Sequence, residues 1–157
     1  MADEDNSRTA LIRGLVAETR RGNLEAFAEL VQRFQDAVYG VALARLGNWH
    51  DAEEVAQEAF LEAWRKLGDL REPGKFPGWL RQLTISSVAR FRRKPKRTAD
   101  LDSALETVSS DEGPEQRAER RELADRVLAA LRSLSEPLRE ATTLFYIDGY
   151  SHNQVAT

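Results

Sequence analysis

Apolar residues recur at three- and four-residue steps along most of the chain, which is the spacing of amphipathic α-helices. The pattern predicts a short first helix over 10–21, a long second helix over 24–47 and a third over 51–68. Asp51 is the expected N-cap of the third helix, with Glu54 as its capping-box partner. The apolar stripe of this third helix consists of Ala52, Val55, Ala56, Ala59, Phe60, Ala63 and Leu67.

The stretch "GDLREPGKFPG" interrupts the helical pattern, because its three glycines and two prolines are typical of a loop. The following "WLRQLTISSVARFRRK" suits a fourth helix, which Pro95 ends. Its β-branched cluster would also suit a strand, but the sequence offers no second strand to pair with it. The expected fold class is therefore all-α.

The character of the chain changes after this fourth helix. The stretch 99–115 carries six acidic residues and several serines but no basic residue, which is linker composition. We expect a flexible acidic linker over 98–115 between a first domain over 10–97 and a second over 116–157. In the second domain, a stripe of apolar residues predicts one helix, and Ser135 is the expected cap of another. A third helix is expected to begin at "SHNQ" and is incomplete at Thr157. The stripe consists of Leu123, Val127, Ala130, Leu131 and Leu134.

Composition narrows the function classes. The absence of cysteine excludes disulfides and thiolate sites. No apolar run approaches the roughly 20 residues of a membrane span, and "MADEDNSRTA" lacks the features of a signal peptide, so we expect a cytoplasmic protein without a membrane partner. The two histidines, His50 and His152, are expected at the surface. Because neither metal-ligand spacing nor a glycine-rich phosphate loop is present, we expect no metal, no cofactor and no catalysis.

Charge is distributed unevenly along the chain. The net charge is −3, yet 65–97 holds eleven basic residues against two acidic ones. Such a chain presents polyanionic and polycationic surfaces to different partners. With Ala56, Ala59, Phe60 and Ala63 facing inward, the third helix exposes a mostly acidic face. Its members are Glu54, Gln57, Glu58, Leu61 and Glu62, with Lys66 spaced to pair with Glu62. From the residues alone, this face is either simply solvated or a docking surface.

Several motifs together resemble a known family. "DAEEVAQEAFLEAW", preceded by "AF..L...F...VY..A" and followed by "F.GWL......V.RFRR", resembles the second conserved region of bacterial sigma factors, specifically the extracytoplasmic-function group of the sigma-70 family. "LRSLSEPLREATTLFYIDGYSHNQVA" is similar to the start of that family's fourth region, where a promoter-reading helix-turn-helix begins. The resemblance covers nearly the whole chain. It implies a non-catalytic transcription initiation factor that binds core RNA polymerase, directs it to promoters and can have an anti-sigma factor as a further partner.

The resemblance also implies a partner for the acidic helix, namely the clamp helices of the largest polymerase subunit. The chemistry fits, because arginines of a partner helix would form charge-assisted hydrogen bonds with the carboxylates while a leucine supplies an apolar anchor. The expected polymerase-binding residues are Asp51, Glu54, Gln57, Glu58 and Leu61.

For the basic block, the resemblance implies recognition and melting of the proximal promoter element, including its non-template single strand. Basic side chains attract phosphates, and the 70–77 loop would hold an unstacked base. Phe76 either stacks on that base or is buried under the loop, and Trp79 is expected in the core. The expected DNA-binding residues are Lys75, Phe76, Arg81, Ser86, Arg90, Arg93, Lys94 and Arg97. The family usually has Asn where Ser86 stands and Asp where Arg90 stands, so the promoter specificity is left open.

A second reading is a helical regulator that binds another transcription protein without touching DNA. Such a protein would bind its partner but would show no salt-dependent binding to single-stranded promoter DNA.

Overall fold

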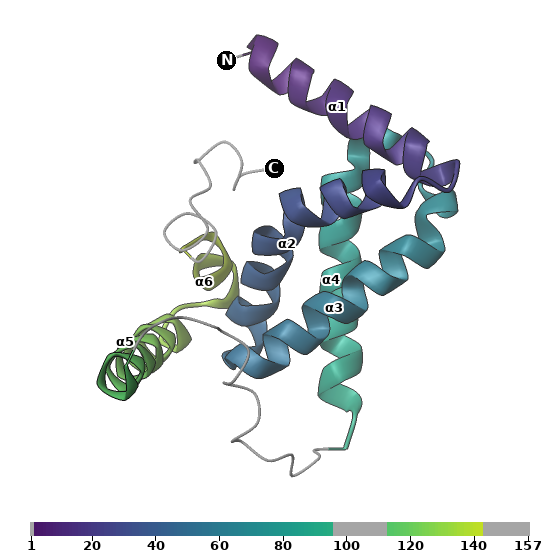
Figure 1. The fold of residues 1–157 in the computed structure, drawn as a ribbon. Helices are drawn as coiled ribbons and strands as arrows, with labels where there is room; N and C mark the ends of the chain where they lie inside the picture. Colours follow the sequence, from purple (N-terminus) through teal and green to yellow (C-terminus); the bar gives the residue numbers. More distant parts are fainter. Residues whose placement is uncertain (1, 96–112, 143–157) are drawn as a thin grey trace.

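The computed structural model describes residues 2–95 and 113–142, and all regular structure within these two ranges is helical (Figure 1). The predicted all-α class is confirmed, and the β-branched cluster of the fourth segment lies in a helix. Most of the predicted linker and the last predicted helix lie outside these ranges. The helices are α1 (Ala2–Arg20), α2 (Leu24–Leu46), α3 (Trp49–Lys66), α4 (Phe76–Arg93), α5 (Pro114–Arg132) and α6 (Glu136–Thr142), with 3-10 turns η1 (Leu67–Asp69) and η2 (Pro73–Lys75).

The junction between α2 and α3 is built by two consecutive capping residues. Gly47 ends α2 in the left-handed conformation, with φ +66°, and its N–H donates to the carbonyl of Leu43 at 2.8 Å. Asn48 then caps α3, because its side-chain oxygen accepts the N–H of Asp51 at 3.0 Å. The prediction that Asp51 is the N-cap is therefore wrong. Asp51 lies in the first turn, where a negative charge suits the helix dipole.

Two other helices begin earlier than the sequence pattern indicated. The first helix starts at Ala2, ahead of the apolar stripe, and its added turns are mostly exposed and polar. The fourth starts at Phe76 inside the predicted loop, because Pro77 fits the first helical turn, where a missing N–H costs no hydrogen bond. In the second part of the chain, α5 begins at Pro114, so it takes in the last two residues of the predicted linker.

Of the predicted stripe of the third helix, Ala52 and Val55 are buried in a separate cluster and Ala56 is half-buried. Helices α1 to α4 pack around a shared core that contains the rest of that stripe. Phe34 of α2 and Phe76 of α4 meet edge to face there, with ring centroids 5.4 Å apart. The prediction for Trp79 fits its position as a partly buried residue packed against this core. The fully or nearly fully buried members include Ile12, Val16, Leu30, Phe34, Val38, Ala59, Ala63, Leu67, Phe76 and Leu80.

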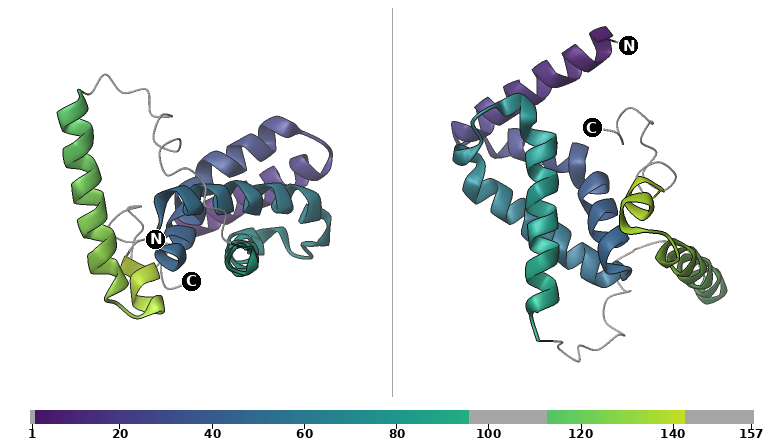
Figure 2. Two further views of the ribbon diagram at one scale, coloured as in Figure 1. Left: turned by 90° about the horizontal axis from the view of Figure 1, so that it is seen from below. Right: turned by 180° about the vertical axis from the view of Figure 1, so that it is seen from behind.

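The second part of the chain joins this body at the C-terminal half of α2. Figures 1 and 2 show α6 beside α2, while α5 extends away from α1–α4. Among the α5 side chains that the structure describes, Leu128 and Leu131 are the buried ones, in a cluster that includes Ala42 of α2. Leu123, Val127 and Ala130 of the predicted stripe lie in α5, so their helical conformation is confirmed, but their side chains are exposed.

Candidate functional site

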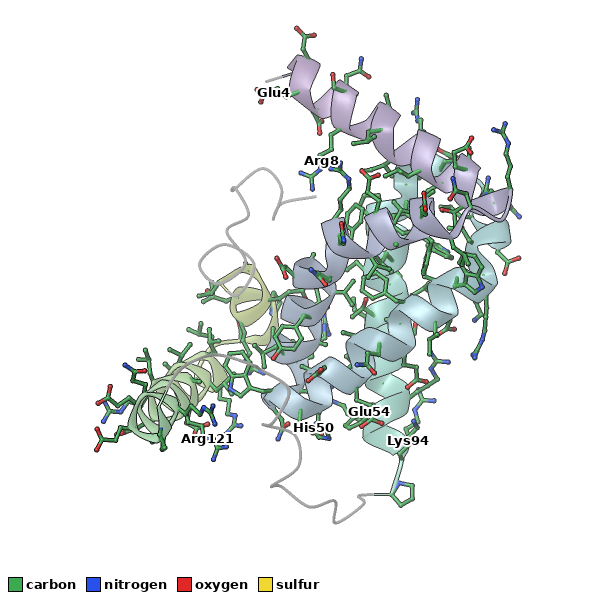
Figure 3. The ribbon with its side chains drawn as sticks, viewed as in Figure 1. Glu4, Arg8, His50, Glu54, Lys94 and Arg121 are labelled. Atoms are coloured by element: carbon green, nitrogen blue, oxygen red, sulfur yellow. The ribbon has the colours of Figure 1, made fainter. Side chains whose placement is uncertain are left out.

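The predicted polymerase-binding residues of α3 share one accessible face. Glu54 and Gln57 are exposed, Glu58 and Asp51 are half-buried, and Leu61 is 57% exposed. This face lies opposite the buried alanine stripe of the same helix. Figure 3 shows Glu54 at the end of the molecule where α3 begins and where Lys94 ends α4. The sequence interpretation missed Trp64, which is partly exposed one turn beyond Leu61 and whose ring lies 5.0 Å from that of Phe27.

Glu62 does not belong to this exposed face. The helical-wheel assignment is wrong here, because α4 crosses α3 at this position and leaves Glu62 only 8% exposed. Its carboxylate accepts a hydrogen bond from Lys66 at 2.6 Å, which confirms the predicted pair, and another from Arg90 of α4. Burial alone would raise the pKa of Glu62, but the hydrogen bonds and positive charges of Lys66 and Arg90 hold that pKa below its ordinary value.

The basic residues of α4 fall into two groups. Arg90 donates to the carboxylate of Glu62 and, at 3.1 Å, to the hydroxyl of Ser87, while its own side chain stays 43% exposed. Ser86, Arg93 and Lys94 are exposed. The Nζ of Lys94 lies 3.7 Å from the carboxylate of Glu58, so the acidic face and the basic end of α4 adjoin each other. Arg97 lies outside the described residues.

Arg81, near the start of α4, is paired with the second part of the chain. Its Nε donates at 2.7 Å to Glu140 of α6, whose carboxylate is also bound by Arg45 of α2 at 2.9 Å. Arg45 pairs with Glu136 as well. Because Glu140 is only 5% exposed, these contacts fix α6 against α2 and α4. Sequence patterns did not indicate this arrangement, because Arg45 and Arg81 lie 95 and 59 positions from Glu140 along the chain.

The loop between α3 and α4 presents charged rather than aromatic side chains. Phe76 is completely buried, at 0% exposure, between Phe34 and Trp79. Of the two alternatives for Phe76, burial under the loop is confirmed and stacking on a promoter base is contradicted, because its ring fills the core. Lys75, the other predicted DNA-binding residue here, is exposed to solvent. Its ammonium group pairs with the carboxylate of Glu72 at 3.1 Å.

No cluster of His, Asp or Glu within the described ranges is arranged to hold a metal ion. His50 is exposed in the first turn of α3, whereas His152 lies outside those ranges. Among the helices described, none is long and apolar enough to cross a membrane. The described part of the chain is a helical body on which an acidic and a basic surface adjoin each other.

Comparison with known proteins identifies the family. A family model described as Sigma-70 region 2 matches residues 30–98. The RNA polymerase sigma-H factor of Pseudomonas aeruginosa is 34% identical, over 91% of this chain and 79% of that protein. The ECF RNA polymerase sigma-E factor of Escherichia coli K12 is 33% identical, over 90% and 79%. A solved structure of CnrH in complex with the cytosolic domain of CnrY aligns with a TM-score of 0.63 at 27% identity, over 93% of this chain and 80% of that one.

The chain therefore belongs to the extracytoplasmic-function group of the sigma-70 family. It is a transcription initiation factor that directs RNA polymerase to promoters. Proteins of this family are regulatory initiation factors, and family membership implies core RNA polymerase and promoter DNA as partners.

Proposed function

We propose that the exposed face of α3 binds the clamp helices of the largest polymerase subunit, while the C-terminal end of α4 and the preceding loop bind and help to melt the proximal promoter element. One observation carries this proposal. Two packed helices place carboxylates and cations on adjoining surfaces, which meet at Glu58 and Lys94. A protein that holds a polymerase with one surface and DNA with the next needs such a partition of charge.

The α3 face has the features of a protein interface. Glu54 and Gln57 are exposed beside Leu61, so charge, a neutral hydrogen-bonding group and an apolar anchor lie together. A partner helix rich in arginine would pair with the carboxylate and cover the leucine. Exposure of a large apolar side chain among polar ones is then explained by burial in the complex.

Charge reversal at Glu54 tests this interface. Glu54 is the better position than Glu58, because reversing Glu58 would also place a positive charge beside Lys94. Glu54→Arg is expected to weaken binding to core polymerase by at least about 2 kcal/mol, roughly 30-fold, through like-charge repulsion. Asp36→Arg, on the exposed side of α2, makes the same charge change and is expected to bind normally. Normal binding by Glu54→Arg, measured by titration with core polymerase, would place the docking surface elsewhere.

The DNA surface is narrower than the basic block of the sequence. All four cations are exposed, but Arg90 and Arg81 pair with the buried carboxylates of Glu62 and Glu140, whereas Arg93 and Lys94 have no buried carboxylate partner in the described part of the chain. Phosphate contacts from exposed cations make affinity depend on salt, with a logarithmic slope of about 0.7 per contact on single strands. Lys75, on the loop before α4, is a further exposed cation that would contact phosphates of the melted strand.

Binding of the assembled holoenzyme to a non-template-strand oligonucleotide, measured across salt concentrations, tests the DNA surface. Arg93→Gln is expected to weaken binding to all sequences alike and to reduce the slope by about 0.7. Arg33→Gln, on α2, removes the same charge from a helix outside the proposed surface and serves as the matched control. A holoenzyme whose affinity for this strand is independent of salt would favour the alternative, a regulator that binds only protein.

We also propose that an anti-sigma factor binds this chain, a proposal supported by the related CnrH, whose solved structure holds the cytosolic domain of CnrY. Exposed Leu61 and Trp64 offer an apolar patch for such a partner. If an anti-sigma factor covers this patch, Leu61→Arg is expected to weaken binding of both that factor and core polymerase. Retention of anti-sigma binding by Leu61→Arg would place its interface on another surface.

A further inference from the structure

Helix α1 supports the back of the loop that joins α3 to α4. Arg20, the last residue of α1, donates from Nε and Nη2 to the carbonyl of Leu67 at 3.3 and 3.1 Å. Its Nη2 also donates to the carbonyl of Leu70. One guanidinium therefore holds two carbonyls of a loop about fifty positions away in the sequence.

The chemistry of this contact suits the end of a helix. The carbonyls at a helix C-terminus lack partners within the helix, and a cation placed there satisfies them while it complements the helix dipole. Here the 3-10 turn η1 extends α3, and the N–H of Leu70 returns to the carbonyl of Leu67 at 3.3 Å. Arg20 thus fixes both ends of the turn that follows α3.

A second contact from α1 lies farther along the same loop. A Cβ atom added at Gly74 would lie 2.9 Å from Nε of Arg13 and 3.4 Å from a methyl group of Thr9. The backbone of η2 therefore packs closely against α1. Helix α1 supports the loop at both of its 3-10 turns, and Arg20 is the member that does so by hydrogen bonds.

The loop is divided between inward and outward side chains. Leu67, Leu70 and Phe76 are buried and anchor it to the core. Asp69, Arg71, Glu72 and Lys75 are exposed on the outside. The backbone conformation between these apolar anchors therefore determines which polar groups would face a bound strand. Arg20 donates hydrogen bonds to that backbone.

We propose that Arg20 is a positioning residue for promoter recognition: by holding the carbonyls of Leu67 and Leu70, it keeps the 67–75 loop in the conformation that presents Arg71 and Lys75 to the promoter strand. This inference rests on the proposed function of the loop as a DNA-contacting element. Arg20 lies outside residues 30–98, the part of the chain that the Sigma-70 region 2 model matches.

The test compares Arg20→Ala with Arg21→Ala in the full chain assembled with core polymerase. Arg21 is the adjacent arginine, and its ion pair within the described ranges is the local one with Glu18, so its removal makes the same change of charge without removing a described contact to the loop. The probes are the non-template strand most enriched by the wild-type holoenzyme from a random library, and a scrambled strand of the same composition. Arg20→Ala is expected to reduce the affinity ratio between the two strands at least fivefold, and Arg21→Ala to leave it unchanged.

A second measurement connects the DNA effect to the loop. Hydrogen exchange at the amide of Leu70 is expected to become at least tenfold faster in Arg20→Ala, and to stay as in the wild type in Arg21→Ala. The exchange rate of the Leu70 amide in Arg20→Lys is expected to lie between those of the wild type and Arg20→Ala, because an ammonium group lacks the planar fork that holds two carbonyls together. Affinity for core polymerase is expected to change less than twofold in all three variants. If Arg20→Ala does not fold, Arg20→Lys is used as the test variant. The proposal would be overturned if the Leu70 amide exchanged faster in Arg20→Lys while the affinity ratio between the two strands stayed as in the wild type.

Two further variants separate the failure of this inference from failure of the loop's proposed function. If Arg71→Gln and Lys75→Gln leave the affinity for both strands unchanged, the loop does not contact DNA, and both proposals are wrong. If those variants weaken DNA binding while Arg20→Ala keeps the wild-type strand ratio, the loop contacts DNA and only the positioning role is wrong.

Discussion

The buried pairing of Glu62 with Arg90 leads to a prediction in which two variants do not add. Removing Arg90 leaves a carboxylate that is 8% exposed with Lys66 as its remaining described partner. Removing the charge of Glu62 instead leaves two cations whose side chains are 43% and 53% exposed and can be hydrated by water. Removing Arg90 is therefore expected to lower the free energy of unfolding more than neutralising Glu62, although both changes break the same contact.

The structure gives a magnitude for each side. Breaking a buried ion pair by removing one partner costs about 3–5 kcal/mol when the remaining charge has no other partner. Because Lys66 stays 2.6 Å from Glu62 and Arg90 is partly solvated, we expect about 2–3 kcal/mol for Arg90→Ala. Glu62→Gln loses charge-assisted hydrogen bonds but avoids burying a carboxylate, so we expect about 1–2 kcal/mol. The double variant is expected to be more stable than Arg90→Ala alone.

The pH dependence follows from the lowered pKa of Glu62. A carboxyl whose pKa is lower in the folded state stabilises the fold fully above its unfolded pKa, and that stabilisation disappears as pH falls through the folded pKa. The ordinary value here is 4.5. The difference in stability between the wild type and Glu62→Gln is therefore expected to be full at neutral pH and to shrink as pH falls below 4.5.

Urea unfolding followed by circular dichroism, at neutral and acidic pH, measures these differences. Arg93→Ala is the matched control, because Arg93 is an exposed arginine of the same helix. In the described part of the chain, Arg93 has no carboxylate partner. It is expected to change stability by less than about 0.5 kcal/mol. Strict additivity of Glu62→Gln and Arg90→Ala, or a cost of Glu62→Gln that grows toward low pH, would refute the reasoning.

Three further predictions concern the helix junction and α6. Gly47→Ala is expected to cost about 1–2 kcal/mol of unfolding free energy, because φ +66° strains a residue with a Cβ; an unchanged midpoint in thermal unfolding would contradict this. Asn48→Ala is expected to cost about 1 kcal/mol by loss of the α3 cap, whereas Asn48→Asp retains a capping oxygen and is expected to stay close to wild type in the same assay. Glu140→Gln weakens the contacts with Arg45 and Arg81, so amide exchange in α6 is expected to accelerate while exchange in α3 does not; equal exchange in α6 would show that these ion pairs do not hold it.

The helical fold could be predicted because the core depends on periodicity within single helices. The predicted stripe from Ala52 to Leu67 is buried except for the half-buried Ala56, since alanine and phenylalanine at helical spacing admit few other arrangements. Helix ends were less predictable. Asp51 and Asn48 both suit an N-cap, and the choice between them is made by the left-handed Gly47 just before, whose conformation a pattern of apolar residues does not encode.

The candidate site was harder to predict, because charge patterns say nothing about which helices cross. Glu62 and Glu58 are equally acidic in sequence, yet α4 covers one and leaves the other partly exposed. The crossing also brings the guanidinium of Arg90 into contact with the carboxylate of Glu62. Under the proposed function we therefore expect fewer phosphate contacts than the charge of the basic block suggests, because arginines paired with buried carboxylates are already partly neutralised before DNA binds. The salt slope of strand binding should accordingly follow the exposed Arg93 and Lys94 and their exposed neighbours, and fall well short of one contact for each of the eleven basic residues in 65–97.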